Sequence, residues 1–128
     1  MCVLSSIFVI AIGRSKNRSN TTIPNTVNYT PEDPIRIDSD EDFTSENGVI
    51  SGNGTEENPY IIEGYSINGE GERYGIFIGN TSSHFVIKDC FIYGVWYDDY
   101  VWPYFSNSGI TLYNVSNGTI DKNIINSC

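Results

Sequence analysis

A short pattern recurs in this chain, and the apolar residues within each copy do not follow the period of a helix. The segment Gly75–Asn80, which reads GIFIGN, returns as Gly109–Asn114, which reads GITLYN. A second pair of segments, Val86–Ile92 and Thr119–Ile125, follows these copies, and Ile61–Ile67 is an earlier partial copy. Apolar residues alternate with other residues in each segment, which is the period of a β-strand. Sequential copies of a strand pattern predict stacked strands.

Two columns of isoleucine share one spacing. Their members are 25 and 33 residues apart in both cases: Ile62, Ile87 and Ile120 in the first column, and Ile67, Ile92 and Ile125 in the second. Equal offsets predict a single register, with Ile76 over Ile110 and Ile78 over Leu112 as further pairs. We therefore expect an all-β coil of short parallel strands, in which each turn buries its apolar face against the next. The alternative is a β-sandwich, which would show hairpin turns between its strands.

Polar residues recur at the corners of the predicted coil. Asn80 and Asn114 occupy equivalent places, and Asn123 takes the place of Cys90. An asparagine at a corner pairs its amide with the same group one turn away, so we expect Asn80 and Asn114 to lie inside as a ladder. Cys90 is expected to be a small buried thiol.

An ordered set of motifs then carries a family resemblance. Pro34–Ile37, Asp42-Phe43, Gly48–Thr55 and Asn58–Gly64 precede the Gly-Ile-x-Ile/Leu-x-Asn repeats. This order resembles the archaeal and bacterial right-handed parallel β-helix proteins of the NosD-like, carbohydrate-binding and sugar-hydrolase type, from Pro34 to the end of the chain. The resemblance implies the N-terminal part of a right-handed parallel β-helix, with about three rungs and an N-terminal cap at residues 35–59. Because such folds host lyases, hydrolases, adhesins and accessory proteins alike, fold alone gives no activity.

The chain divides into three predicted parts. Residues 1–13 are an apolar, leader-like segment, residues 14–34 are a polar linker, and residues 35–128 are the β-helix. The apolar segment is shorter than the roughly 20 residues that a membrane-spanning helix needs, so we do not expect a transmembrane protein. The leader-like pattern instead predicts an exported protein that is extracellular or on the cell surface. Since Cys128 follows a predicted strand and no C-terminal cap is visible, we expect further rungs or another domain.

Charge limits the partners. Sixteen Asp and Glu residues stand against seven Lys and Arg residues, a net charge of −9, which argues against nucleic acid. The acidic run from Asp38 to Asp42 lacks the glycine and spacing of an EF-hand, so it predicts a solvated turn or short helix and no metal site. The single histidine, His84, and the scattered cysteines offer no copper or zinc cluster, and no cofactor is expected.

The repeat is interrupted between its second and third copies by an aromatic segment, residues 93–105, which holds both tryptophans. Insertions in repeat proteins usually lie on one face, often the binding face. Aromatic rings fit sugar faces, and carboxylates accept hydrogen bonds from hydroxyl groups. The candidate ligand-binding residues, for a polysaccharide or surface glycan, are Trp96, Tyr97, Asp98, Asp99, Tyr100 and Trp102. The alternative is that these rings only cover the flank of the coil.

Two functions remain open from the sequence. The first is a secreted or cell-surface β-helix module with a binding or structural role, with carbohydrate recognition through the loop at 93–105. The second is the N-terminal part of a carbohydrate-active enzyme, a glycosidase or lyase, whose catalytic residues lie outside this chain. The chain itself is more consistent with a non-enzyme, and no catalytic residue is assigned, because glycoside hydrolysis needs two carboxyl groups facing each other across the bond.

Seven Asn-x-Ser/Thr sequons complete the sequence signals. They begin at Asn17, Asn20, Asn28, Asn53, Asn80, Asn114 and Asn117. In an exported protein each is a possible glycan site. The linker sites Asn20 and Asn28 are favoured over those in the rungs, although a chain rich in Asn, Ser and Thr also produces sequons by composition alone.

Overall fold

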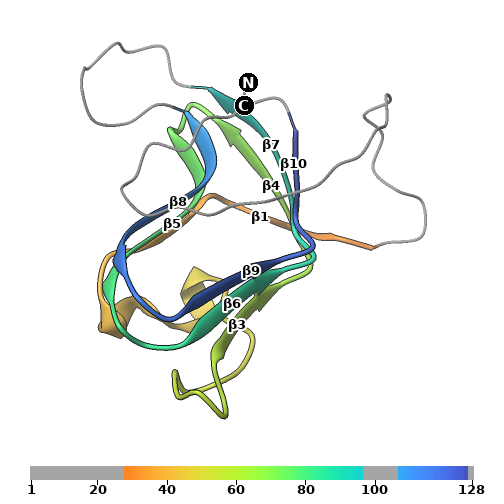
Figure 1. Ribbon diagram of the computed structural model, residues 1–128. Coiled ribbons are helices and arrows are strands. Elements are labelled where there is room, and N and C mark those ends of the chain that lie inside the picture. The colour runs from red at the N-terminus through yellow and green to blue at the C-terminus, as the bar shows by residue number, and fades with distance from the viewer. Residues whose placement is uncertain (1–27, 97–106, 127–128) are drawn as a thin grey trace.

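The computed structural model describes residues 28–96 and 107–126, which form short strands and two single-turn 3-10 helices (Figure 1). In chain order the elements are β1 (Thr30–Glu32), β2 (Ile35–Ile37), η1 (Asp40–Asp42), η2 (Ser45–Asn47), β3 (Tyr60–Glu63), β4 (Tyr65–Glu70), β5 (Tyr74–Thr81), β6 (Phe85–Lys88), β7 (Phe91–Trp96), β8 (Ser108–Val115), β9 (Gly118–Asp121) and β10 (Ile124–Asn126). Within these ranges, no helix has the length and apolar character needed to cross a membrane.

The strands form three parallel sheets around a common interior (Figure 1). Sheet A has the order β1-β4-β7-β10, sheet B the order β2-β5-β8, and sheet C the order β3-β6-β9. The chain therefore passes through sheets A, B and C in turn, and each strand lies beside the strand three places earlier in the chain. This arrangement confirms the prediction of an all-β fold of parallel strands and is not the hairpin arrangement of a β-sandwich.

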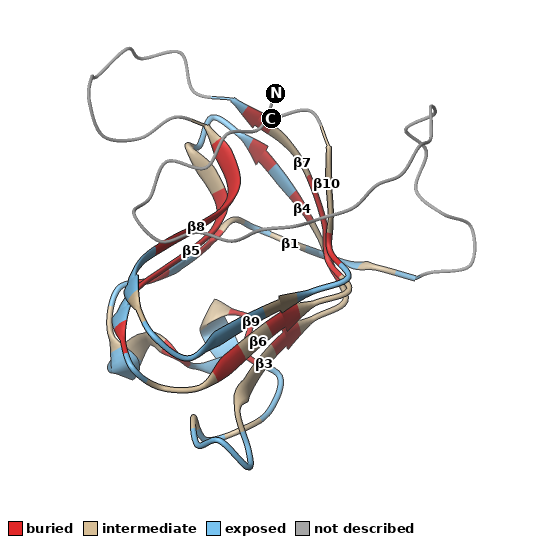
Figure 2. Cartoon of the chain, in the orientation of Figure 1, coloured by how far each residue is buried: buried red, intermediate tan, exposed pale blue. Residues whose placement is uncertain are grey.

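The predicted isoleucine columns are confirmed in the strand register. Ile62 pairs with Ile87 and Ile87 with Ile120 in sheet C, while Ile92 lies between Ile67 and Ile125 in sheet A. Sheet B pairs Ile76 with Ile110 and Ile78 with Leu112, as expected. These side chains point inward and form the core, so buried residues line the inner faces of the sheets (Figure 2).

A close contact explains the glycine that opens each Gly-Ile-x-Ile/Leu repeat. Gly75 is the second residue of β5, and a Cβ atom there would lie 2.3 Å from Cγ2 of Ile92. Gly109, its counterpart in β8, would place a Cβ atom 2.5 Å from Cγ2 of Ile125. Both distances are shorter than a van der Waals contact, so the isoleucines of sheet A can fill the core only where sheet B has glycine.

The N-terminal part of the fold differs in detail from the expectation. β1 lies inside residues 14–34, the segment predicted as a linker, and pairs with β4, so the folded part begins at least five residues before the expected boundary at residue 35. Three residues of backbone pairing need no apolar pattern, so no periodicity in the sequence marks this strand. The predicted cap at 35–59 in turn contains β2, a strand of sheet B, before the two 3-10 turns.

The asparagine ladder forms, but on the outside. Asn114 Nδ2 donates to Asn80 Oδ1 at 3.1 Å, as the pairing prediction requires. Both residues are exposed, so the expectation that they lie inside the coil is wrong. The cause is local backbone conformation: φ is +53° at Asn80 and +55° at Asn114, in the left-handed region that asparagine tolerates better than most residues.

The interior corner is instead occupied by Asn123 and Cys90, both of them buried. Asn123 Oδ1 accepts a hydrogen bond from the backbone N–H of Cys90 at 2.9 Å, and its Nδ2 donates to the carbonyl oxygen of Ile87, also at 2.9 Å. The side chain thus satisfies two backbone groups of the preceding turn. Asn123 and Cys90 thus occupy equivalent places in successive turns, and the Cys90 thiol is buried, as the sequence predicts.

Candidate functional site

The aromatic segment predicted at 93–105 begins inside a strand. Its first four residues complete β7, and Trp96 is the last residue of that strand. The Trp96 side chain is 61% exposed, more than the other large hydrophobic residues in the described ranges. The remaining candidate residues, Tyr97, Asp98, Asp99, Tyr100 and Trp102, lie outside the residues that the structure describes.

A β-bulge at Gly94 determines which way Trp96 points. Asn68 pairs with Tyr93 and Glu70 with Trp96, so β7 has one residue more than β4 between these pairs. Without the extra residue, strict alternation from the outward Tyr93 would turn Val95 outward and Trp96 inward. With it, Val95 is fully buried and Trp96 is exposed. Bulges that redirect a side chain in this way are common beside functional sites.

Gly94 is the residue that permits the bulge. Its φ of +67° lies in the left-handed region, where glycine has no steric cost. A Cβ atom at this position would also lie 2.7 Å from Oδ1 of Asn68. A side chain at position 94 would therefore strain the backbone and displace Asn68 from the surface beside Tyr93.

Trp96 ends a row of aromatic side chains along β7, which we call the sheet A aromatic row: Phe91, Tyr93 and Trp96. The rings of Phe91 and Tyr93 lie with centroids 5.2 Å apart, tilted by 32°. Tyr29, just before β1, adds a ring 5.8 Å from that of Phe91. Phe91 is buried, so it supports the row, while Tyr93 is partly exposed and Trp96 is the most accessible member.

Polar groups lie on either side of this row. Asn68 and Glu70 of β4 are the pairing partners of Tyr93 and Trp96, and Asn126 of β10 pairs with Tyr93 from the other side. Asn68 and Glu70 are both exposed, and Asn68 Oδ1 accepts a hydrogen bond from the backbone N–H of Glu70 at 3.1 Å. That bond orients the amide, and its Nδ2 atom donates to no residue in the described ranges.

Burial changes the pKa of Tyr29, whose ring lies beside Phe91. Its phenol is partly removed from water and lies near the charge of Asp89, and both effects raise the pKa of Tyr29 above its ordinary value. The hydroxyl therefore stays protonated at neutral pH and can donate as well as accept a hydrogen bond. The face formed by the row offers flat rings, an amide and a carboxylate within one sheet.

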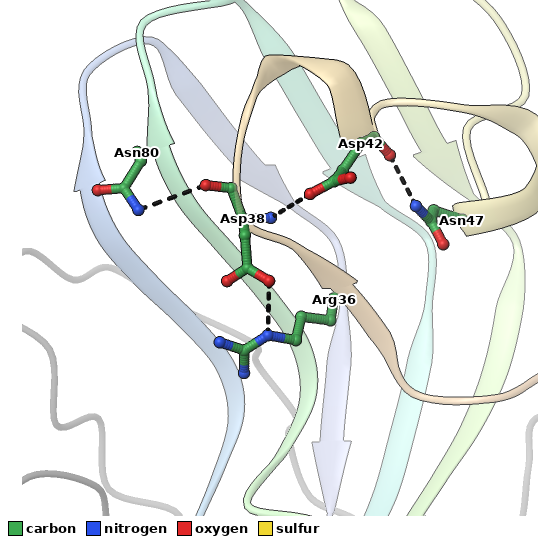
Figure 3. A network of polar contacts seen from close by, with 5 residues as sticks. All are labelled: Arg36, Asp38, Asp42, Asn47 and Asn80. Atoms are coloured by element: carbon green, nitrogen blue, oxygen red, sulfur yellow. Dashed lines mark hydrogen bonds and ion pairs between the residues drawn. The ribbon is translucent and has the colours of Figure 1, made fainter.

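The acidic run near the N-terminus has a different role. The Asp38 carboxylate forms an ion pair with Arg36 Nε at 2.8 Å, and the Asp38 carbonyl oxygen accepts a hydrogen bond from Asn80 Nδ2 at 3.3 Å (Figure 3). Asp42 accepts from the backbone N–H of Asp38 at 3.0 Å, and its own carbonyl oxygen accepts from Asn47 Nδ2 at 2.9 Å (Figure 3). The carboxylates thus fasten the 3-10 turns to sheet B. Across the described parts of the chain, no cluster of three His, Cys, Asp or Glu side chains is arranged to hold a metal ion.

The sequence predicts Trp96 as a candidate residue but not the residues around it. Asn68 and Tyr93 each follow a member of the Ile67–Ile92 column, so the predicted register already implied that they lie side by side. Phe91 precedes Ile92 and lies outward for the same reason. Tyr29 has no such signal, because it lies in the segment predicted as a linker. The bulge at Gly94 also had none, since one glycine after a strand residue is equally consistent with a turn.

In comparisons with known proteins, no family model, no curated protein and no solved structure matches the chain.

Proposed function

We propose that this chain is part of an exported or surface-attached right-handed parallel β-helix that binds carbohydrate on the outer face of sheet A. The solenoid is supported by the cyclic order in which the chain visits the three sheets and by the uniform parallel register. Right-handedness follows from the general rule for crossovers between parallel strands of one sheet. Export rests on the leader-like residues 1–13, and kinship with the NosD-like proteins rests on the motif order alone.

One observation carries the binding role: the bulge at Gly94 turns Trp96 into solvent beside Tyr93. A regular strand would have buried a tryptophan here and gained the free energy of removing its large apolar surface from water. The strand instead buries the smaller Val95 and exposes Trp96. A pyranose ring presents C–H groups on its face and hydroxyls at its edge, which match an aromatic ring flanked by Asn68 and Glu70.

A binding experiment with a matched control tests this proposal. The full chain is screened on an array of polysaccharides and glycans, and the hits are measured by calorimetry for the wild type, Trp96→Ala and Tyr113→Ala. Tyr113 is the control because it is a 45% exposed aromatic residue on sheet B, away from the row. We expect Trp96→Ala to weaken binding at least about tenfold, or about 1.4 kcal/mol, and Tyr113→Ala to leave it unchanged.

Thermal melting of the same variants separates binding from stability. An exposed tryptophan contributes little to the core, so Trp96→Ala should melt like the wild type. The proposal would be contradicted if the wild type bound no glycan and Trp96→Ala were destabilised. The Trp96 ring would then cover the flank of the strands and bind no ligand. The enzyme alternative, with catalytic residues elsewhere, and the continuation into further rungs stay predictions.

A further inference from the structure

The segment between Ser51 and β3 has no part in the aromatic row. It projects away from the sheets ahead of β3 (Figure 1) and carries one of the sequons, Asn53-Gly54-Thr55. Its base is held by backbone bonds: the N–H groups of Asn53 and Gly54 donate to the carbonyl oxygen of Asn58 at 2.9 and 3.0 Å, and His84 N–H donates to Gly54 O at 2.9 Å. The segment is therefore an ordered projection with an exposed tip.

Inside this projection, the sequon side chains contact each other. Asn53 Oδ1 accepts hydrogen bonds from the hydroxyl of Thr55 at 2.8 Å and from its backbone N–H at 3.3 Å. Both bonds reach the oxygen of the amide, and Asn53 Nδ2 donates to no residue in the described ranges. Asn53 itself is exposed. The reactive nitrogen of the sequon is thus open to solvent, and the threonine is already positioned beside the amide.

The sequons of the rungs are arranged in the opposite way. Asn80, Asn114 and Asn117 each use Nδ2 as a donor to the preceding turn. The acceptors are Asp38 O at 3.3 Å, Asn80 Oδ1 at 3.1 Å and Ser82 O at 2.7 Å. Modification of these nitrogens would interfere with contacts between turns, whereas Asn53 Nδ2 makes no such contact with the part of the chain that the structure describes.

We propose that Asn53 is an N-glycosylation site of the folded protein. This inference depends on the export that is part of the proposed function. The donor is a polyprenyl-diphosphate-linked oligosaccharide: a bond forms between Asn53 Nδ2 and C1 of the first sugar, and the bond from C1 to the diphosphate oxygen breaks. The amide nitrogen loses one proton to a base of the transferase, and the lipid diphosphate leaves with the electron pair.

The site is compatible with the binding face. The projection leads into β3 of sheet C, while the aromatic row lies on β7 of sheet A. A glycan on Asn53 therefore extends from a different face and leaves Trp96 accessible.

The test uses the folded full chain, a purified oligosaccharyltransferase and a lipid-linked oligosaccharide donor, with glycopeptide mass spectrometry to assign the modified residues. Four variants accompany the wild type: Asn53→Gln, Thr55→Ala, Thr55→Ser and Asn58→Gln. Asn58 is the matched control, because it is an exposed asparagine of the same projection that is followed by Pro59 and Tyr60 and so forms no sequon. Heat-denatured chain is assayed in parallel. Because no export step is involved, a failure here is distinguishable from failure of the glycan-binding experiment.

We expect one glycan mass on the peptide that contains Asn53, retained in Thr55→Ser and Asn58→Gln and lost in Asn53→Gln and Thr55→Ala. Asn80, Asn114 and Asn117 should remain unmodified in the folded chain. The proposal is overturned if Asn53 stays unmodified in the folded chain, whether or not the denatured chain accepts a glycan there. It is also overturned if the three rung sites are occupied as fully as Asn53.

Discussion

The two ends of the strand stack are finished in different ways. At the N-terminal end, Phe43 stacks on Tyr60 with ring centroids 4.4 Å apart and closes the interior of sheet C. The free edge of β3 is also covered, because Ile61 exchanges backbone hydrogen bonds with Ile50 and Ser51 in an isolated antiparallel bridge. This end is therefore closed by the segment that follows β2.

Sheet A closes its N-terminal end with polar residues. Glu32 of β1 pairs with Ile67 and so takes the next place in the column that continues through Ile92 and Ile125. The column changes from isoleucine to glutamate where it reaches the end of the stack. A charged residue in the edge strand also discourages pairing with a further strand.

Within the described residues, the C-terminal end has no covering segment and no edge strand of this kind. Ile120 and Ile125, the last members of the two columns, are only partly buried, although their counterparts Ile62 and Ile67 are fully buried. Identical side chains in identical columns thus have different environments, because one end is covered while, among the described residues, no strand pairs with the far side of β9 or β10. Burial in a stack of this kind depends on the neighbouring turn more than on the residue itself.

The largest expected effect comes from a charge at either end of one column. Ile62→Asp should abolish cooperative folding, because an unpaired carboxylate in a fully buried place costs several kcal/mol, a large share of the roughly 5–15 kcal/mol that stabilises a domain. Ile120→Asp should retain a cooperative transition at reduced temperature, since water reaches its partly exposed position. Thermal melting followed by circular dichroism measures both.

Equal loss of folding in the two variants would show that the C-terminal end is as well covered as the N-terminal one. Ile50→Asp is a suitable control, because Ile50 is 53% exposed and its replacement should hardly change the melting temperature.

The repeating part of this fold was accessible from sequence, because each turn places the same residue types at the same offsets. Ile87 and Ile92 could be assigned to their columns from spacing alone. The ends were not accessible in this way. β1 is held by backbone pairing, and the covering role of Phe43 depends on a ring contact across 17 residues of chain, neither of which leaves a periodic signal.

The candidate site shows the same division. Trp96 was predicted as a site residue because it falls where the repeat is interrupted, and it is exposed. Its orientation depends on the φ of Gly94, a single backbone angle that no residue pattern specifies. Asn80 and Asn114 were assigned to the wrong side for a similar reason, since their positive φ values turn corner residues outward.

The second prediction concerns the polar residue that joins the last turn to the stack. Asn123→Leu removes the acceptor of the Cys90 N–H and the donor to the Ile87 carbonyl, and each buried group left unsatisfied costs about 1–3 kcal/mol. We expect a total loss of about 2–6 kcal/mol in the free energy of unfolding, measured by denaturant titration.

Asn114→Gly is its control in the same turn. It removes only a ladder bond between exposed amides, and glycine keeps the φ of +55° without strain, so the loss should stay below about 1 kcal/mol. A similar loss in both variants would mean that the interior corner contributes no more than the outer ladder.

The smallest effect tests whether an asparagine at position 90 can form the same buried hydrogen bonds, one turn earlier, as Asn123. Cys90 lies one turn before Asn123, its sulfur faces the backbone N–H groups of Tyr65 and Gly64, and the thiol donates to the carbonyl oxygen of Lys88 at 3.4 Å. Cys90→Asn would offer those N–H groups a stronger acceptor, as Asn123 does for Cys90. We expect a gain of about 1 kcal/mol at neutral pH by denaturant titration.

The pH dependence of the same variant identifies the cause of that gain. Burial raises the pKa of the Cys90 thiol from its ordinary value of 9.0 to about 11, against a smaller opposing effect of the Tyr65 and Gly64 N–H groups. Because the folded state holds this proton more tightly, the thiol's contribution to stability is complete below pH 9 and declines as the pH rises through about 11. The wild type should therefore lose stability over this interval, while Cys90→Asn, which has no titrating group there, should lose less, so the difference between them widens. A constant difference across the interval would show that the thiol titrates as it does in the unfolded chain, and the corner at Cys90 would then be open to water.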